Sequence, residues 1–122
     1  MDAASAQRAA EEWIAAWNRR DLDGILDHYA EEVEFCAPTV VACWGIASGK
    51  LTGKAELRKH FARGLEVAPN IHFELVAVLH GVNALTVLYR RETGALVADA
   101  VELDQNGKVI RGHAYYSQPP RS

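Results

Sequence analysis

The sequence predicts an α+β fold in which three helices from the first half of the chain pack on a curved, mainly antiparallel sheet. Apolar residues follow helical spacing in much of the chain before Pro69, and strand-like alternation dominates from Ile71 onwards. Four strands are predicted in that second part, and their short connections make neighbouring strands antiparallel. A sheet that curves over helices forms a cone, so we expect an internal pocket.

Two helices are predicted before residue 30. The first covers residues 4–19, because its apolar side chains share one helical face. The second begins after Asp21, which is a good N-cap residue. The apolar faces of these helices comprise Ala10, Trp13, Ile14 and Trp17 in the first and Leu22, Ile25, Leu26 and Tyr29 in the second.

The middle of the chain has weaker patterns. A short strand, Val33–Ala37, is predicted to stop at Pro38, which has no N–H for a sheet. Residues 39–52 are interpreted as a second short strand, Val40–Trp44, followed by a loop. A third helix begins at Thr52-Gly53 and ends at Ala68-Pro69, since the residue before a proline disfavours helix.

The last part of the chain has the clearest pattern. An Asn106-Gly107 pair between two alternating segments is typical of a tight hairpin turn. Four strands are predicted: Ile71–His80, Leu85–Glu92, Leu96–Leu103 and Lys108–Ser117. We expect a single domain over residues 1–122, with an ordered core of about 4–117.

Composition restricts the possible functions. The 122 residues are 49% hydrophobic and carry a net charge of −3, which argues against general binding to nucleic acid or to an anionic membrane. No apolar stretch approaches a membrane span, and the first residues do not resemble a signal peptide, so a cytoplasmic location is expected. Cys36 and Cys43 are expected to be reduced, buried thiols; a disulfide remains an alternative, whereas ligand spacing for a metal is lacking. We expect neither a metal nor another cofactor.

One carboxyl group stands out in the strand Leu96–Leu103. Alternation places Asp99 in an otherwise apolar row with Val97, Val101 and Leu103. A carboxyl group there must find a partner, stay protonated or face a polar cavity. Asp99 is therefore a candidate acid/base, and a purely structural carboxylate is the alternative.

The last strand predicts two contrasting faces. Ile110, Gly112, Ala114 and Tyr116 form one face, which we expect to line the pocket, because the two small residues leave room beside a tyrosine hydroxyl. The opposite face carries Arg111, His113 and Tyr115, which we expect on the outside of the sheet.

The chain resembles the SnoaL-like and nuclear transport factor 2-like superfamily over nearly its whole length. The similarity is carried by Trp13 to Ile25, Tyr29 to Phe35, Leu51 to Arg58 and the Asn-Gly-Lys-Val turn at 106–109. It implies a cystatin-like cone, and its members include isomerases, polyketide cyclases, epoxide hydrolases, dehydratases and noncatalytic binding proteins. Fold alone therefore does not decide function.

The resemblance can be tested residue by residue against the ketosteroid isomerases. Their late-strand aspartate corresponds to Asp99, but Trp13 stands at the position of their first-helix tyrosine and Ala37 at that of their base. Losing the base removes the group that carries the proton, so we do not expect a standard ketosteroid isomerase. The epoxide hydrolases need an Asp-Arg-Asp set, for which only Asp99, with Arg90 or Arg91 as its partner, can be placed.

The polyketide cyclases also use an aspartate as acid/base inside the cone, a role that Asp99 can fill. The resemblance places His60 toward the interior, where it could act with Asp99; the alternative is a histidine at the edge of the core. Trp13 is expected in the core, with an N–H that could reach a ligand. The expected lining of the pocket comprises Trp13, Tyr29, Phe35, His60, Asp99, Ala114 and Tyr116.

Three functions follow as hypotheses. The first is a cofactor-independent cyclase or isomerase that acts on a small, mostly apolar carbonyl compound, with Asp99 and His60 as catalytic residues. The second is a noncatalytic small-molecule-binding module. The third is a protein-interaction domain that uses the outer face of Arg111, His113 and Tyr115, the face through which the resemblance implies a homodimer.

Overall fold

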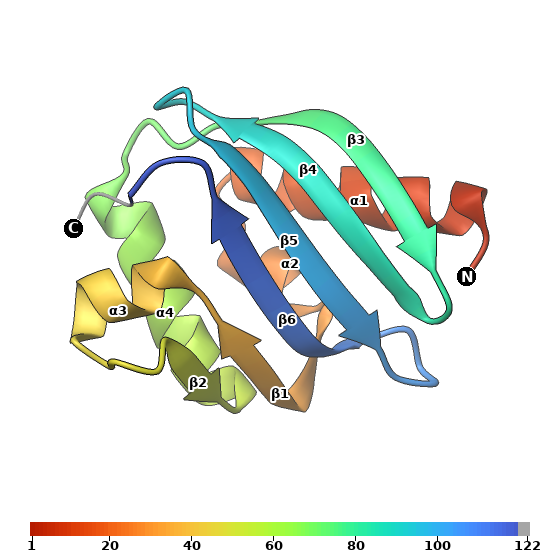
Figure 1. Cartoon of the computed structure of the whole chain (residues 1–122), viewed down its shortest axis with the longest axis horizontal. Coiled ribbons are helices and arrows are strands. Elements are labelled where there is room, and N and C mark those ends of the chain that lie inside the picture. The colour runs from red at the N-terminus through yellow and green to blue at the C-terminus, as the bar shows by residue number, and fades with distance from the viewer. Residues whose placement is uncertain (120–122) are drawn as a thin grey trace.

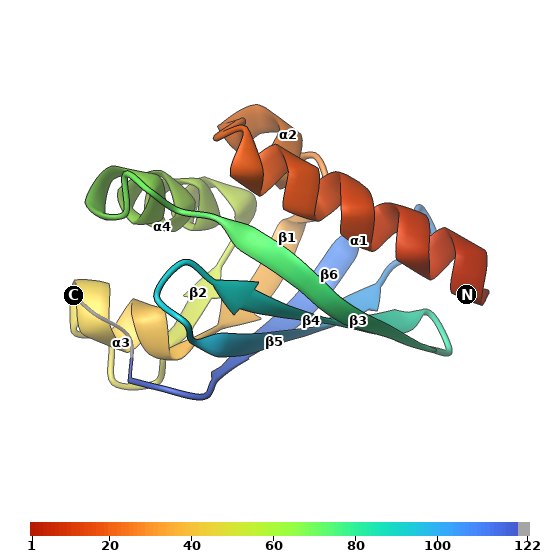
Figure 2. The ribbon, with the colours of Figure 1, turned by 90° about the horizontal axis from the view of Figure 1, so that it is seen from above.

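Four helices and a six-stranded sheet form the computed structural model, which describes residues 1–119 (Figure 1). The helices are α1 (Ala3–Asn18), α2 (Leu22–Leu26), α3 (Pro38–Trp44) and α4 (Lys54–Val67). Figure 2 shows that α1, α2 and α4 lie on the same side of the curved sheet, whereas α3 lies near one end of it. The predicted α+β architecture is confirmed, with a fourth helix.

The sheet is mixed, with a single parallel pair among the described strands. Its strands are β1 (Tyr29–Cys36), β2 (Lys50–Thr52), β3 (Phe73–Gly81), β4 (Ala84–Arg91), β5 (Leu96–Leu103) and β6 (Val109–Tyr116). Their order across the sheet is β2-β1-β6-β5-β4-β3, and all neighbours are antiparallel except β1 and β6. The parallel pair brings the first strand beside the last, which joins the helical half of the chain to the four-strand meander.

Two expectations for the middle of the chain are wrong. The segment expected as the strand Val40–Trp44 is helix α3: Pro38 takes its first position, where a missing N–H costs nothing, and Gly45 ends it with φ of 69°. Tyr29, expected on the second helix, instead opens β1, because α2 ends at Leu26. The three-residue strand β2 was not predicted, since three residues are too few to show a period.

The end of α1 is tied to the beginning of β3 by one side chain. Asn18 donates from Nδ2 to the Phe73 carbonyl oxygen (2.9 Å) and accepts from the Phe73 N–H at Oδ1 (2.8 Å). This reciprocal pair satisfies two backbone groups across 55 positions of sequence. It fixes α1, with its tryptophans, over the inner face of the sheet.

Two further findings bear on the expectations above. Cys36 and Cys43 are free thiols, but both are partly exposed, where buried thiols were expected. Within residues 1–119, none of the helices has the length and apolar character needed to cross a membrane.

Candidate functional site

A cavity of about 610 Å³ opens between the inner face of the sheet and helices α1, α3 and α4. Seven aromatic side chains contribute to its wall, and ring centroids stand 4.3 Å apart for Phe73 and Tyr89 and 5.0 Å apart for Trp17 and Phe61. The aromatic residues of the lining are Trp13, Trp17, Phe35, Phe61, Phe73, Tyr89 and Tyr116. Such a wall favours a flat, apolar ligand.

Asp99 is the buried carboxyl group of this cavity. It lies on β5, is only 6% exposed and accepts a hydrogen bond at Oδ2 from the Tyr89 hydroxyl (2.8 Å). Burial raises the pKa of Asp99 from 3.8 to about 6, and the bond from Tyr89 lowers it in part. Among the described residues no hydrogen bond reaches its other oxygen, Oδ1, so that atom can serve a bound molecule. The predicted inward orientation of Asp99 is confirmed.

Tyr89 is a residue of the site that the sequence analysis missed. Burial, with the Asp99 charge, raises the pKa of Tyr89 well above 10, so its hydroxyl remains a donor. Leu85, Val87 and Tyr89 alternate inward along β4, and Val87 pairs with Asp99 across the strands. The alternation was visible in the sequence, but which tyrosine meets Asp99 depends on the register between β4 and β5.

His60 lies on α4, is 6% exposed and lines the cavity. Its Nδ1 accepts a hydrogen bond from Trp44 Nε1 (3.0 Å), and its Nε2 lies 2.9 Å from Thr39 Oγ1. Burial lowers the pKa of His60 from 6.5 to about 4, so the ring is neutral near pH 7. His60 and Asp99 line the same cavity, but their hydrogen bonds go to other residues in the described chain. Thr39 and Trp44 were missed because α3 was expected to be a strand.

Trp13 and Tyr29 form a hydrogen bond with each other. Trp13 Nε1 donates to the Tyr29 hydroxyl oxygen (3.1 Å), so the N–H considered for a ligand is used within the protein. Trp13 lines the cavity, whereas Tyr29, at 3% exposed, lies outside the lining found for the described residues. Tyr29 was therefore placed wrongly in the pocket, because it was assigned to a helix instead of to the first position of β1.

Three of the other expected lining residues lie where the alternation of β1 and β6 put them, whereas Ile110 and Gly112 are absent from the lining of this cavity within residues 1–119. Phe35, Ala114 and Tyr116 all line the cavity, and Ala114 pairs directly with Asp99 on β5. Burial raises the pKa of the Tyr116 hydroxyl to about 12, which keeps it protonated at neutral pH. Their contact with a ligand stays a prediction.

One ion pair borders the cavity. Arg91 donates to both oxygens of Glu92, from Nε and Nη2 at 2.9 Å each, and its guanidinium lies 5.5 Å from the centre of the Phe73 ring. Arg91 is thus engaged by Glu92, whereas the exposed Arg90 donates to the Gly94 carbonyl. No cluster of three His, Cys, Asp or Glu side chains suited to a metal ion occurs within residues 1–119.

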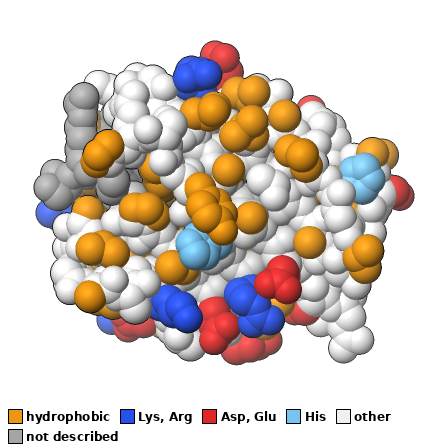
Figure 3. Space-filling view, viewed as in Figure 1, with side chains coloured by type: hydrophobic (Ala, Val, Ile, Leu, Met, Phe, Trp, Pro, Cys, Tyr) orange, Lys and Arg blue, Asp and Glu red, His pale blue; other side chains and the backbone are white. Residues whose placement is uncertain are grey.

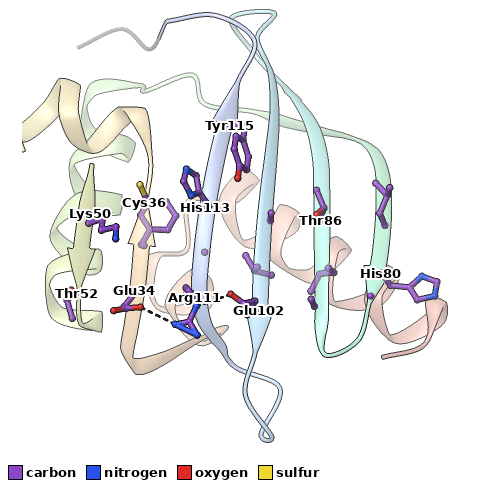
Figure 4. A pocket seen from close by; sticks show the side chains of 18 residues that line it. Glu34, Cys36, Lys50, Thr52, His80, Thr86, Glu102, Arg111, His113 and Tyr115 are labelled. Carbon is purple, nitrogen blue, oxygen red and sulfur yellow. Dashed lines mark hydrogen bonds and ion pairs between the residues drawn. The ribbon is translucent and has the colours of Figure 1, made fainter. Parts of the chain in front are cut away.

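The open face of the sheet carries a second hollow, of about 620 Å³ (Figure 4). Arg111 lies there between Glu34 (3.1 Å) and Glu102 (2.9 Å), and His113 stacks on Tyr115 at 4.6 Å. Figure 3 shows apolar side chains over this face beside a group of mixed charges. The predicted outward orientation of Arg111, His113 and Tyr115 is confirmed, and this hollow lies on the side of the sheet opposite Asp99.

The two hollows differ in chemistry. The inner cavity combines aromatic walls with one carboxyl group of raised pKa and several neutral donors, which suits proton exchange with an apolar compound. The outer hollow is bordered by charged side chains, and Arg111 is already paired there with Glu34 and Glu102. The inner cavity is therefore the candidate site.

Comparison with known proteins agrees with this architecture. Residues 10–117 match the family model of the SnoaL-like domain, and no curated protein matches the chain. A SnoaL-like protein of unknown function from Burkholderia thailandensis is 36% identical, with a TM-score of 0.92 over 96% of this chain and 98% of that chain.

Two more distant structures share the fold alone. TerC, co-crystallized with polyporic acid, is 18% identical, with a TM-score of 0.74 over 92% of this chain and 91% of that chain. A protein of unknown function with a cystatin-like fold from Methylobium petroleophilum is 15% identical, with a TM-score of 0.75 over 100% of this chain and 82% of that chain. Because the domain model spans residues 10–117 and the Burkholderia protein is similar from end to end, the chain belongs to the SnoaL-like family.

Proposed function

We propose that this protein binds a small, mostly apolar carbonyl compound in the inner cavity and exchanges a proton with it through Asp99, without a cofactor, as an isomerase or cyclase does. The observation that carries the proposal is the buried Asp99 carboxyl group in an aromatic cavity of about 610 Å³, with a pKa raised to about 6. A group that titrates near neutral pH can both take and return a proton.

The chemistry balances with the residues of the cavity alone. The Asp99 carboxylate takes a proton from the carbon beside the ligand carbonyl, and the C–H electron pair forms an enolate. Returning the proton to another carbon of the conjugated enolate isomerises the compound. Attack of the enolate carbon on a second carbonyl closes a ring instead, and the alkoxide that forms takes the proton back from Asp99. Tyr89 holds one oxygen of Asp99, which leaves the other directed to this exchange. The co-crystallization of TerC with polyporic acid supports ligand binding by this fold.

The test uses 2-tetralone, a ketone in a ring fused to benzene, with exchangeable protons beside its carbonyl, in D₂O. We expect saturable quenching of tryptophan fluorescence and deuterium uptake by the ketone, measured by mass spectrometry. Ala114→Leu, which places a larger side chain opposite Asp99, is expected to weaken both by about tenfold or more. The matched control Ala98→Leu, on the open face of β5, is expected to change neither.

A noncatalytic binding module is the second candidate, and Ala37 favours it. Ala37 is buried at the end of β1, where a related isomerase would carry its base, and it has no group that moves a proton. Binding of 2-tetralone that Ala114→Leu abolishes, without deuterium uptake above that of the buffer, would select this alternative. Absence of both binding and uptake would contradict the whole proposal.

We further propose that the open face of the sheet binds a second copy of this chain. Leu79 and Tyr115 are 57% and 55% exposed there, beside the charges of Lys50, Arg111 and Glu102. A face with apolar side chains and both charge signs can pair with itself across a twofold axis, since Lys50, which has no ion pair within residues 1–119, can meet an acidic group of the partner.

Tyr115→Glu is expected to convert this dimer into a monomer, because it adds two like charges at a symmetric contact. Light scattering after size-exclusion chromatography measures the mass directly. Val82→Glu, at a residue 91% exposed in the β3–β4 turn, is the control and is expected to remain dimeric. A monomeric wild-type protein would instead leave this face available to a foreign partner and would contradict the proposal.

A further inference from the structure

Three side chains from α3 and α4 form a hydrogen-bonded chain that ends at the wall of the cavity. Trp44 Nε1 lies 3.0 Å from His60 Nδ1, and His60 Nε2 lies 2.9 Å from Thr39 Oγ1. Thr39 and His60 line the cavity, whereas Trp44 is 45% exposed at the far end of the chain. The three residues thus connect the outer surface of α3 to the interior.

The direction of these bonds follows from the chemistry of the indole. The Trp44 N–H can only donate, so His60 Nδ1 must be the acceptor and carries no proton. A neutral imidazole then has its single proton on Nε2, which makes Thr39 Oγ1 an acceptor. The lowered pKa of His60, about 4, agrees with a neutral ring. Both hydrogen bonds therefore run from Trp44 toward the cavity.

Thr39 is left with a hydroxyl proton to donate. One lone pair of its oxygen is engaged by His60, and its O–H is directed at the Tyr116 hydroxyl, because a hydrogen bond from Thr39 lowers the pKa of Tyr116. Asp99 raises the pKa of the same tyrosine, so its carboxyl group lies near this pair of hydroxyls. The Thr39 hydroxyl, which can turn from Tyr116 to a ligand, and the Asp99 carboxyl group thus flank one region of the cavity wall.

We propose that Thr39 donates a hydrogen bond to the carbonyl oxygen of the bound compound, and that His60 and Trp44 are positioning residues that fix Thr39 as a donor. This inference rests on the proposed function and specifies its ligand: a compound whose acceptor oxygen reaches Thr39 while the neighbouring carbon reaches Asp99. It gives His60 a role in orientation in place of direct proton transfer. The cavity is therefore expected to bind a ketone more tightly than the corresponding hydrocarbon.

The first test compares 2-tetralone with tetralin, the same ring system without the carbonyl. Thr39→Val replaces the hydroxyl with a methyl group. It is expected to lower the affinity for 2-tetralone about three- to tenfold and to leave the affinity for tetralin unchanged. The carbonyl stretch of bound 2-tetralone is expected to shift to higher wavenumber in the variant. Thr86→Val, at a threonine lining the outer hollow, is the matched control and should alter neither value.

The outcomes separate the two proposals. If both compounds bind equally to wild type and Thr39→Val changes neither affinity nor carbonyl stretch, the role of Thr39 is wrong while the binding cavity stands. If neither compound binds to the wild-type protein, the proposed function fails, and this inference fails with it.

A second test begins with the protein alone. Nitrogen-15 NMR of the imidazole is expected to show the Nε2–H form of His60 near pH 7 in the wild-type protein. Trp44→Phe removes the donor to Nδ1, so a second tautomer should become populated, and 2-tetralone should bind more weakly with tetralin unaffected. A wild-type His60 with its proton on Nδ1 would overturn the inference.

Discussion

Asp99→Asn is expected to slow deuterium uptake by 2-tetralone by about 10²-fold or more and, at the same time, to stabilise the protein at pH 7 by about 3 kcal/mol. The amide cannot take a proton, but its oxygen can still accept the hydrogen bond from Tyr89. The gain in stability arises because burial raises the pKa of Asp99 from 3.8 to about 6, so the ionised carboxylate opposes folding. Loss of activity with gain of stability is typical of a functional group, not of a structural one.

The pH dependence of stability is a second test of the prediction that the ionised Asp99 carboxylate opposes folding. Between pH 3.8 and about 6 the folded protein binds more protons at Asp99 than the unfolded chain, so this contribution to the free energy of unfolding falls as pH rises. His60 acts in the opposite direction: its folded pKa of about 4 lies below 6.5, so its contribution rises over nearly the same range. The two slopes offset each other in the wild-type protein.

Asp99→Asn removes the contribution of Asp99 and keeps that of His60, so the free energy of unfolding of the variant is expected to rise from about pH 4 to about pH 6.5. Urea denaturation at several pH values measures this slope, and Asp27→Asn, at an exposed residue, is the control. An Asp99→Asn variant less stable than wild type at pH 7 would mean that the ionised carboxylate braces the fold, and the acid/base role would then be withdrawn.

Local pattern predicted most of the fold. The apolar face with Trp13 and Trp17 correctly predicted the first helix, and the Asn106-Gly107 turn correctly predicted the last hairpin. The segment after Pro38 was predicted wrongly as a strand, because the neighbouring Val40 and Val41 favour one. The helix that forms there depends on Pro38 at its first position and on Gly45 after its last. In this segment the positions of proline and glycine thus indicate the secondary structure better than the strand propensity of the valines does.

Residues of the candidate site could be predicted only where the alternation along a single strand determines which face a side chain lies on. Alternation along β5 and β6 placed Asp99, Ala114 and Tyr116 on the inner face, but the partners of the polar groups come from elsewhere in the chain. Tyr89 reaches Asp99 through the register of β4. Trp44 reaches His60 through a hydrogen bond between α3 and α4, which no pattern in the sequence reports.

Trp17→Ala is expected to destabilise the protein by about 3–5 kcal/mol, the largest effect on stability predicted here. Trp17 is 5% exposed, and its ring packs edge-on against Phe61 at 5.0 Å and lies 5.1 Å from Phe73. Its Nε1 is the one buried side-chain polar atom without a hydrogen-bond partner within residues 1–119, so removing it leaves no partner unsatisfied. Urea denaturation measures the loss, and Trp44→Ala, at a ring 45% exposed, is expected to cost about 1 kcal/mol through its bond to His60.

The same variant tests whether the core and the cavity are one structure. Because Trp17 lines the cavity, the space that its ring vacates joins the existing cavity of about 610 Å³. Added indole is then expected to restore more stability to Trp17→Ala, in proportion to the logarithm of its concentration, than it adds to Trp44→Ala, which keeps the original cavity. An equal effect of indole on the two variants would mean that the wall collapses into the vacated space. A larger effect on Trp17→Ala would mean that one set of aromatic side chains both holds the helices on the sheet and shapes the cavity, so that a ligand which fills the cavity also stabilises the fold.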